Sequence, residues 1–212
     1  MSLKGKNTSP FPGIQPYQES ESSSFYARER EIEDVLSILQ RYKVVTVSGE
    51  NGAGKTSLIN AGVIPKLKNK FSGQSGKDWV VCSLRPGISP IENLCHSLSD
   101  SGVLYTNGKS KTTDHKNYTR IIEEKKDLGL IEIFGNSEIY EKKNLLIVID
   151  QLEDLFKYTQ FFDSKESLED NVLFDLIYST SRYKETAIYF IIVIQTDFVS
   201  KLNSYDRFTE LL

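Results

Sequence analysis

The sequence predicts an α/β fold in which a mainly parallel β-sheet is covered by helices on both faces. Four runs are continuously apolar and rich in β-branched residues, as in strands buried on both faces. They span residues 44–48, 79–84, 145–149 and 188–194. Segments of helical periodicity separate these runs, and strands that alternate with helices form parallel sheets. The 212 residues suffice for one substantial domain, so we expect three layers around a single sheet.

Residues 1–24 predict an extended N-terminal arm, followed by the folded domain in residues 25–212. The arm is rich in Ser, Pro and Gly, and Pro10, Pro12 and Pro16 favour extended or turn backbone over helix. Residues 1–3 are typical of a remnant from an expression vector, and no part of the predicted fold depends on them.

Apolar residues at helical spacing predict the helices. The segments are residues 29–40, 55–64, 90–98, 118–134 and 168–182. The first has acidic residues in its first turn, where the helix dipole favours them. Residues 101–116 are polar and rich in Gly, Ser and Thr, and predict a loop.

The composition argues against several classes of protein. The net charge is −3, without a block of five or six like charges, so nucleic acid is not indicated as a partner. The longest apolar run, residues 187–194, is too short to span a bilayer, and the N-terminus lacks an apolar signal core. These features predict a cytoplasmic protein. Cys82 and Cys95 lack metal-site spacing and are expected to be reduced, buried thiols.

The stretch from residue 49 to residue 56, GENGAGKT, matches the phosphate-loop (P-loop) pattern G-x-x-x-x-G-K-[ST] in full. Glycines let successive N–H groups turn inward around an anion, and the following helix adds its positive N-terminus. In such a loop Lys55 reaches the β- and γ-phosphates and the Thr56 hydroxyl ligates Mg²⁺. The alternative is an ordinary Gly-rich turn. The predicted nucleotide contacts in this loop are Gly49, Glu50, Asn51, Gly52, Ala53, Gly54, Lys55, Thr56 and Ser57.

The stretch NLLIVIDQLEDLF places acids directly after a predicted buried strand. Asp150 is expected to hold Mg²⁺ next to Thr56, and its alternative role is a helix N-cap. Glu153 and Asp154 follow within reach of an attacking water, although a solvated acidic first turn would explain them too. The fourth strand ends at Gln195 and Thr196, where polar groups either contact the γ-phosphate or satisfy local backbone groups.

Together these segments resemble the STAND class of P-loop ATPases, and specifically its novel STAND NTPase domain, over nearly the whole chain after residue 9. The resemblance rests on PFPGIQPYQESESSSFYARERE, GENGAGKTSLINAGVIPKL, WVVCSLRPGISPIENL, LLIVIDQLEDLF and IIVIQTDF, in that order.

The resemblance implies roles for residues at matching positions. Arg28, in the segment of residues 26–29, would lie near the nucleotide base or ribose. Lys55 and Thr56 would bind phosphate and Mg²⁺, Asp150 would be the Walker B acid, and Glu153 would orient the attacking water, so that Lys55 and Glu153 are the predicted catalytic residues. The turn formed by residues 85–87 would shape the face beside the P-loop.

The chain departs from the family pattern at two positions. Ala27 stands where the family usually has Gly, which leaves the contact to the base plausible. Gln195 stands where the family usually has Arg, and an amide cannot neutralise developing phosphate charge as a guanidinium can. This second departure weakens the case for efficient hydrolysis but not the case for binding.

Related folds order their sheet 5-1-4-3-2. From this resemblance we expect a fragment truncated at its C-terminus, with strand order 1-4-3-2 and the fifth strand missing. An unpaired strand edge invites pairing with another chain.

The sequence therefore predicts a Mg²⁺-dependent, ATP-binding P-loop domain of a larger cytoplasmic regulator. Family members are typically slow ATP switches in signalling or antiphage defence, which implies ATP and ADP as ligands, downstream sensor domains of the same protein as partners, and an assembly that depends on nucleotide. The alternative is a non-catalytic, nucleotide-gated scaffold. A GTPase lacks support because the later half has no N-K-x-D motif, and a small-molecule kinase lacks an arginine-rich lid segment.

Overall fold

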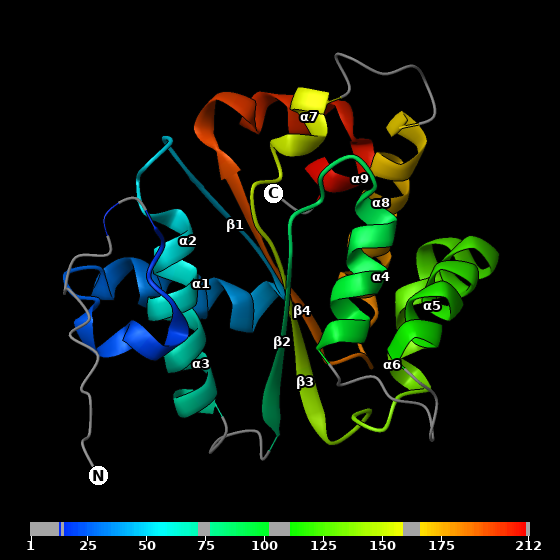
Figure 1. Ribbon diagram of the computed structural model, residues 1–212, viewed down its shortest axis with the longest axis horizontal. Helices are drawn as coiled ribbons and strands as arrows, with labels where there is room; N and C mark the ends of the chain where they lie inside the picture. The colour runs from blue at the N-terminus through cyan, green and yellow to red at the C-terminus, as the bar shows by residue number, and fades with distance from the viewer. Residues whose placement is uncertain (1–12, 14, 72–76, 102–110, 159–165, 211–212) are drawn as a thin grey trace, which may run out of the picture.

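The computed structural model describes residues 13, 15–71, 77–101, 111–158 and 166–210. A four-stranded sheet runs through the centre, with helices on both faces (Figure 1). Its strands are β1 (Val44–Gly49), β2 (Asp78–Leu84), β3 (Lys143–Ile149) and β4 (Ile188–Gln195). They are ordered β1-β4-β3-β2 and every neighbouring pair is parallel, which confirms the predicted order.

The register brings the carboxyl ends of the strands to one edge of the sheet. Gly49 lies opposite Gln195, and Ile149 lies opposite both Ile192 and Leu84. The residues that follow these strands therefore meet above the same edge, which is where open parallel sheets bind ligands.

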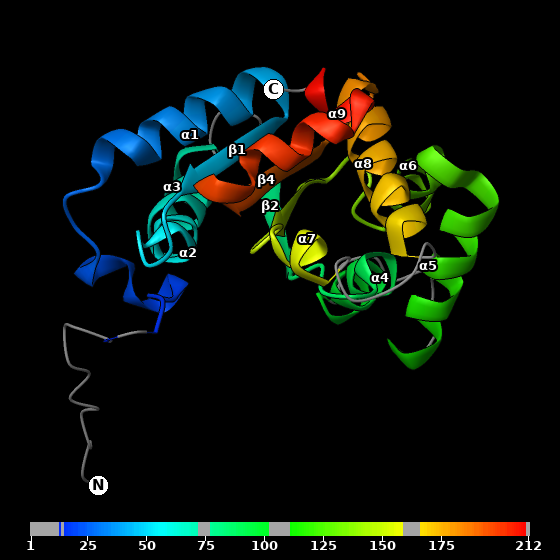
Figure 2. The ribbon, with the colours of Figure 1, turned by 90° about the horizontal axis from the view of Figure 1, so that it is seen from above.

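The two faces of the sheet form separate hydrophobic cores because strand side chains alternate between faces. Figure 2 shows α1 (Glu29–Tyr42) and α3 (Ile64–Phe71) on one face, where strand residues such as Leu146 and Ile191 are buried. The opposite face buries Ile147 and Phe190. It is covered by α4 (Pro90–Asp100) and α8 (Glu166–Arg182), and α5 (Lys111–Lys125) and α6 (Gly129–Gly135) pack on the outer side of these two helices (Figure 2).

The helical segment after β1 confirms the helix predicted for residues 55–64 and extends it to residue 71. It consists of α2 (Lys55–Ser57), the π-helical segment η2 (Leu58–Val63) and α3. Pro65 follows the π-helical turn. A proline inside a helix lacks a donor and crowds the carbonyl four residues earlier, so a widened turn at this point accommodates it.

The prediction of one helical segment over residues 118–134 needs a correction. The structure has two helices, α5 and α6, joined by the 3₁₀ turn η3 (Lys126–Leu128). The loop predicted for residues 101–116 is wrong for residues 111–116, which are helical, while residues 102–110 lie outside the described residues. The first part of α5 is polar, and its described buried residues, Tyr118 and Ile122, come later, so apolar periodicity could not reveal where it begins.

Gly129 allows α5 and α6 to approach closely, and Gly129→Ala is therefore expected to destabilise the fold. A Cβ at this position would lie 2.7 Å from the backbone Cα of Ile122, which cannot move aside as a flexible side chain could. We expect the free energy of unfolding to fall by about 1–3 kcal/mol in urea denaturation. Gly135→Ala in the same helix is the matched control, because its Cβ would meet nothing within 4 Å. Equal stability of the two variants would contradict this account of the contact.

The remaining elements are 3₁₀ helices and short α-helices. Part of the predicted arm forms the 3₁₀ helix η1 (Glu19–Ser24). After β3 comes the short helix α7 (Asp154–Tyr158), and after β4 come η4 (Thr196–Ser204) and α9 (Asp206–Thr209). No described helix has the length and apolar character needed to cross a bilayer.

Both cysteines are free and buried, as the sequence predicts. Burial raises the pKa of the Cys82 thiol to about 12 and that of the Cys95 thiol to about 11. Both groups therefore remain protonated and unreactive near neutral pH.

Candidate functional site

A cleft of about 560 Å³ lies at the carboxyl edge of the sheet. The loop between β1 and α2 forms one wall, the ends of β3 and β4 form the floor, and the N-terminal arm closes one side. Its lining residues are Gly13, Gln15, Pro16, Asn51, Gly52, Gly54, Lys55, Thr56, Ser57, Arg85, Asp150, Gln151, Glu153, Val193 and Gln195. Most of the predicted P-loop contacts thus share one cleft with the two predicted acids.

The P-loop has the backbone conformation that its glycines permit. Gly52 and Gly54 both have φ of +77°, a left-handed conformation that side chains with a Cβ rarely adopt. The Ala53 N–H donates to the Glu50 carbonyl at 3.2 Å, and the Leu58 N–H donates to the Gly54 carbonyl at 2.8 Å. The loop is therefore a closed turn that leads directly into a helix, as a phosphate-binding loop requires, and its nucleotide contacts stay a prediction.

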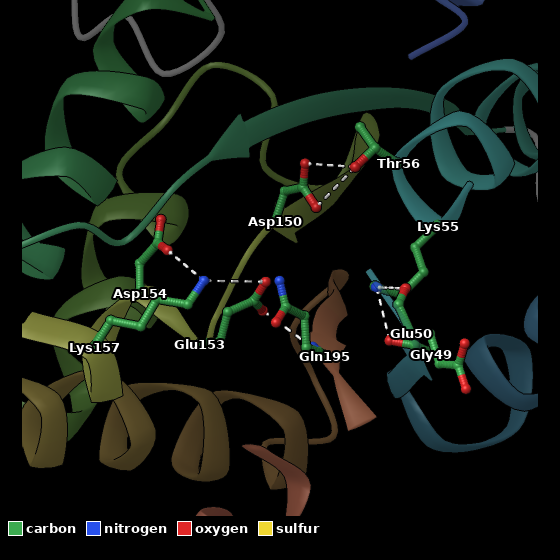
Figure 3. Close-up of polar contacts among 9 residues, drawn as sticks. All are labelled: Gly49, Glu50, Lys55, Thr56, Asp150, Glu153, Asp154, Lys157 and Gln195. Atoms are coloured by element: carbon green, nitrogen blue, oxygen red, sulfur yellow. Dashed lines mark hydrogen bonds and ion pairs between the residues drawn. The ribbon is translucent and has the colours of Figure 1, made fainter. Parts of the chain in front are cut away.

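The Lys55 ammonium lies within this loop. Its Nζ donates to the carbonyl oxygens of Gly49 and Glu50, each at 2.8 Å (Figure 3). Because both acceptors are neutral carbonyls, the charge of the lysine is not cancelled and remains available to an anion in the cleft.

Thr56 and Asp150 come together across the cleft from different elements. The Thr56 hydroxyl donates to the Asp150 carboxylate, with distances of 3.2 Å to Oδ1 and 3.0 Å to Oδ2 (Figure 3). The Asp150 N–H donates to the Leu84 carbonyl at 2.8 Å and so fixes the acid at the end of β3. Asp150 precedes α7 by four residues, which excludes it as the N-cap of that helix.

These two oxygen groups fit a Mg²⁺ ion. Asp150 is only 9% exposed, and no ion pair of its carboxylate with a described cationic side chain is present. Mg²⁺ is typically held by one or two protein oxygens together with substrate phosphates. The described residues contain no group of three or more His, Cys, Asp or Glu side chains suited to a metal. A single carboxylate beside a hydroxyl matches a metal bound together with a nucleotide.

Glu153 is buried in the floor of the cleft, with only 2% of its surface exposed. Its Oε2 accepts the Gln195 N–H at 3.1 Å, and its Oε1 lies 3.8 Å from the Lys157 ammonium (Figure 3). The chain reaches this position through Gln151, whose φ of +58° bends the backbone after β3. Glu153 is therefore held on both oxygens while it lines the cleft.

Asp154 and Thr196 do not line the cleft, in contrast to the adjacent residues Glu153 and Gln195. The Asp154 carboxylate pairs with Lys157 at 3.4 Å, and neither Asp154 nor Thr196 is among the described residues that line the cleft. Gln195 does line it, and its backbone N–H holds Glu153. The structure thus brings Glu153 and Gln195 together at the cleft and places Asp154 and Thr196 beside it.

Arg28 reaches the P-loop from the start of α1. Its Nη1 donates to the Ala53 carbonyl at 3.2 Å, and its Nε donates to the Glu31 carboxylate at 2.6 Å. The contact with a base or ribose stays a prediction, because the guanidinium here binds the backbone of the loop. The preceding Ala27 has φ of +65°, a conformation that favours glycine and explains why a glycine would suit this position.

The sequence missed the part of the arm that lines the cleft, namely Gly13, Gln15 and Pro16. The Tyr17 N–H donates to the Ser57 hydroxyl at 3.1 Å, so the side chain of Ser57 binds the arm. An ion pair of 2.7 Å between Glu19 and Lys68 attaches the arm to α3. The three closely spaced prolines of the arm predict the shape of its backbone rather than its position, and the family resemblance assigned no cleft contact to Gly13, Gln15 or Pro16.

The chain matches the family model of novel STAND NTPase 1 over residues 10–212. No curated protein and no solved structure matches. The matched range includes the arm, the P-loop and the ends of all four strands, and so covers every element that lines the cleft.

Proposed function

The chain belongs to the novel STAND NTPase 1 family, and from this membership we propose that it binds ATP together with Mg²⁺ in the cleft at the carboxyl edge of the sheet. Nucleotide binding by a P-loop NTPase domain follows from the family. One observation carries the finer proposal: the Lys55 ammonium in its glycine loop and the Thr56–Asp150 pair line the same cleft.

Each group has a distinct part in this proposal. The loop N–H groups and Lys55 bind the phosphates, and Thr56 with Asp150 holds the metal. When bound, Mg²⁺ would neutralise part of the phosphate charge. Glu153 lines the same cleft, where its carboxylate would orient a water and accept its proton. Slow hydrolysis would then act as a conformational switch.

The contact between Glu153 and the Gln195 N–H supports the switch. Gln195 is the last residue of β4, and η4 begins at the next residue. A movement of Glu153 on binding or turnover would therefore act on the segment that leaves the sheet. We propose that this change serves downstream sensor domains of a larger cytoplasmic regulator, and that assembly depends on nucleotide.

Calorimetric titration of the chain with ATP and with GTP, with and without Mg²⁺, tests the proposal. We expect ATP to bind, Mg²⁺ to strengthen that binding, and GTP to bind more weakly, because the sequence has no guanine-reading N-K-x-D motif in its later half. Absence of binding to either nucleotide would contradict the proposal.

A second function, a nucleotide-gated scaffold without turnover, is supported by the surroundings of Glu153. Both carboxylate oxygens have partners, and Gln195 brings no positive charge to the cleft. Incubation with ATP followed by analysis of the bound nucleotide separates the two functions. Intact ATP after prolonged incubation supports the scaffold, and bound ADP with released phosphate supports the switch.

A further inference from the structure

Arg85 is the charged residue of the cleft that the proposed function leaves without a role. The side chains of Lys55, Asp150 and Glu153 all have hydrogen-bond partners: the Gly49 carbonyl, the Thr56 hydroxyl and the Gln195 N–H, respectively. The Arg85 side chain is exposed, and among the described residues no hydrogen bond or ion pair holds its guanidinium. An unpaired guanidinium that lines a cleft can bind an anion with several parallel N–H donors.

The sheet places Arg85 beside the predicted metal ligands. It directly follows Leu84, whose carbonyl accepts the Asp150 N–H at 2.8 Å. Arg85 lines the main cleft and also a smaller adjoining pocket of about 210 Å³, to which Thr56 and Asp150 contribute as well. It therefore faces the same space as the hydroxyl and carboxylate that would hold Mg²⁺.

The backbone that carries Arg85 is fixed by its neighbours. Pro86 is buried and has a restricted φ, and its carbonyl accepts a hydrogen bond of 2.8 Å from the Asn93 side chain on α4. Gly87 completes the turn with φ of +56°. The long side chain thus extends from a well-defined point at the edge of the cleft.

Arg85 and Lys55 approach the cleft from opposite edges of the sheet. Lys55 follows β1 and Arg85 follows β2, and these are the two outer strands. In a P-loop the backbone amides hold the first two phosphates, while the hydroxyl after the lysine marks the metal near the terminal phosphate. The Arg85 guanidinium lines the same pocket as Thr56 and Asp150, so it would lie near the terminal phosphate of a bound nucleotide.

We propose that Arg85 binds the γ-phosphate and so distinguishes a nucleoside triphosphate from a diphosphate. This assignment rests on the proposed nucleotide site and adds the residue that reads its phosphorylation state. From the end of β2, Arg85 supplies a positive charge that the uncharged Gln195, at the end of β4, does not provide.

The test compares the affinities of Arg85→Gln and wild type for ADP and for an ATP analogue with a non-hydrolysable β–γ bridge, both with Mg²⁺. We expect the variant to bind the analogue about 10- to 100-fold more weakly, as the loss of a charge-assisted hydrogen bond predicts. The affinity for ADP is expected to change less than about twofold, because ADP lacks the phosphate that Arg85 contacts.

Two further variants serve as controls. Arg120→Gln removes the same charge from an exposed arginine on α5, where it pairs with Glu124 at 2.8 Å, and is expected to leave both affinities unchanged. Arg85→Lys keeps the charge without the planar fork and is expected to recover part of the preference for the triphosphate. Thermal unfolding of each variant detects any general loss of structure.

The outcomes separate this inference from the proposed function. If wild type binds, Lys55→Ala does not, and Arg85→Gln retains the wild-type ratio of the two affinities, the role of Arg85 is wrong and the nucleotide site stands. If Arg85→Gln weakens the affinities for the analogue and for ADP equally, the role of Arg85 is also wrong. If wild type binds neither ligand, the proposed function fails and this assignment fails with it.

Discussion

Replacing Lys55 with alanine is expected to weaken ATP binding by about 100-fold or more, equivalent to about 2.7 kcal/mol. The ammonium lies within the P-loop, and its partners among the described residues are the neutral carbonyls of Gly49 and Glu50. Its charge is thus positioned for a highly charged phosphate chain, and the alanine variant removes both that charge and two contacts that close the loop. Calorimetric titration with ATP and Mg²⁺ measures the effect.

Two other variants show whether the loss comes from this ammonium. Lys66→Ala removes the same charge from α3, where the lysine pairs with Glu33 at 3.5 Å, and is expected to bind ATP like wild type. Lys55→Met keeps most of the aliphatic stem and is expected to behave like the alanine variant. If Lys55→Met binds ATP with unchanged affinity, the phosphate-binding role of Lys55 is wrong.

Glu153→Gln is expected to reduce ATP turnover by about 100-fold or more while the affinity for ATP stays within about threefold of wild type. Glutamine has nearly the same shape, and its carbonyl oxygen can still accept the Gln195 N–H. It cannot take a proton from water, however, so only the chemical step is affected. Phosphate release under saturating ATP measures turnover, and calorimetry measures affinity.

Asp154→Asn is the matched comparison, because it neutralises the adjacent acid, which pairs with Lys157 beside the cleft. We expect its turnover to stay close to that of wild type. Equal turnover in Glu153→Gln and wild type would remove Glu153 from the catalytic role. Turnover that is already undetectable in wild type would favour the scaffold function instead.

Local signals predicted the parts of the site that belong to single segments. The P-loop is a contiguous pattern in which glycines at 52 and 54 supply left-handed backbone, and the strands are short apolar runs. Asp150 follows such a run, and the parallel order of the sheet then brings it to the same edge as Thr56. The prediction failed where the apolar periodicity is weak. The first part of α5 is polar, and residues 111–116 of this helix were predicted to be a loop.

Other features required the folded chain. The arm lies beside the P-loop through the bond between the Tyr17 N–H and Ser57, forty positions apart in the sequence. Arg28 binds the Ala53 carbonyl, and Glu153 accepts the Gln195 N–H, although no local pattern pairs these residues. Such contacts depend on how distant segments pack, and one sequence carries no direct record of that packing.

The sequence by itself thus determined the α/β class, the strand order through its family resemblance, and the candidate phosphate and metal groups. The class and the candidate groups follow from hydrophobic periodicity and from sequence motifs, which are local properties of the chain, whereas the strand order follows only from the resemblance. Only the tertiary structure decided which acid faces the cleft, where the arm lies and that Arg85 lines the cleft without a partner among the described residues. These features arise because the sheet brings residues from β1, β2, β3 and β4 to one edge, where side chains far apart in sequence share one space.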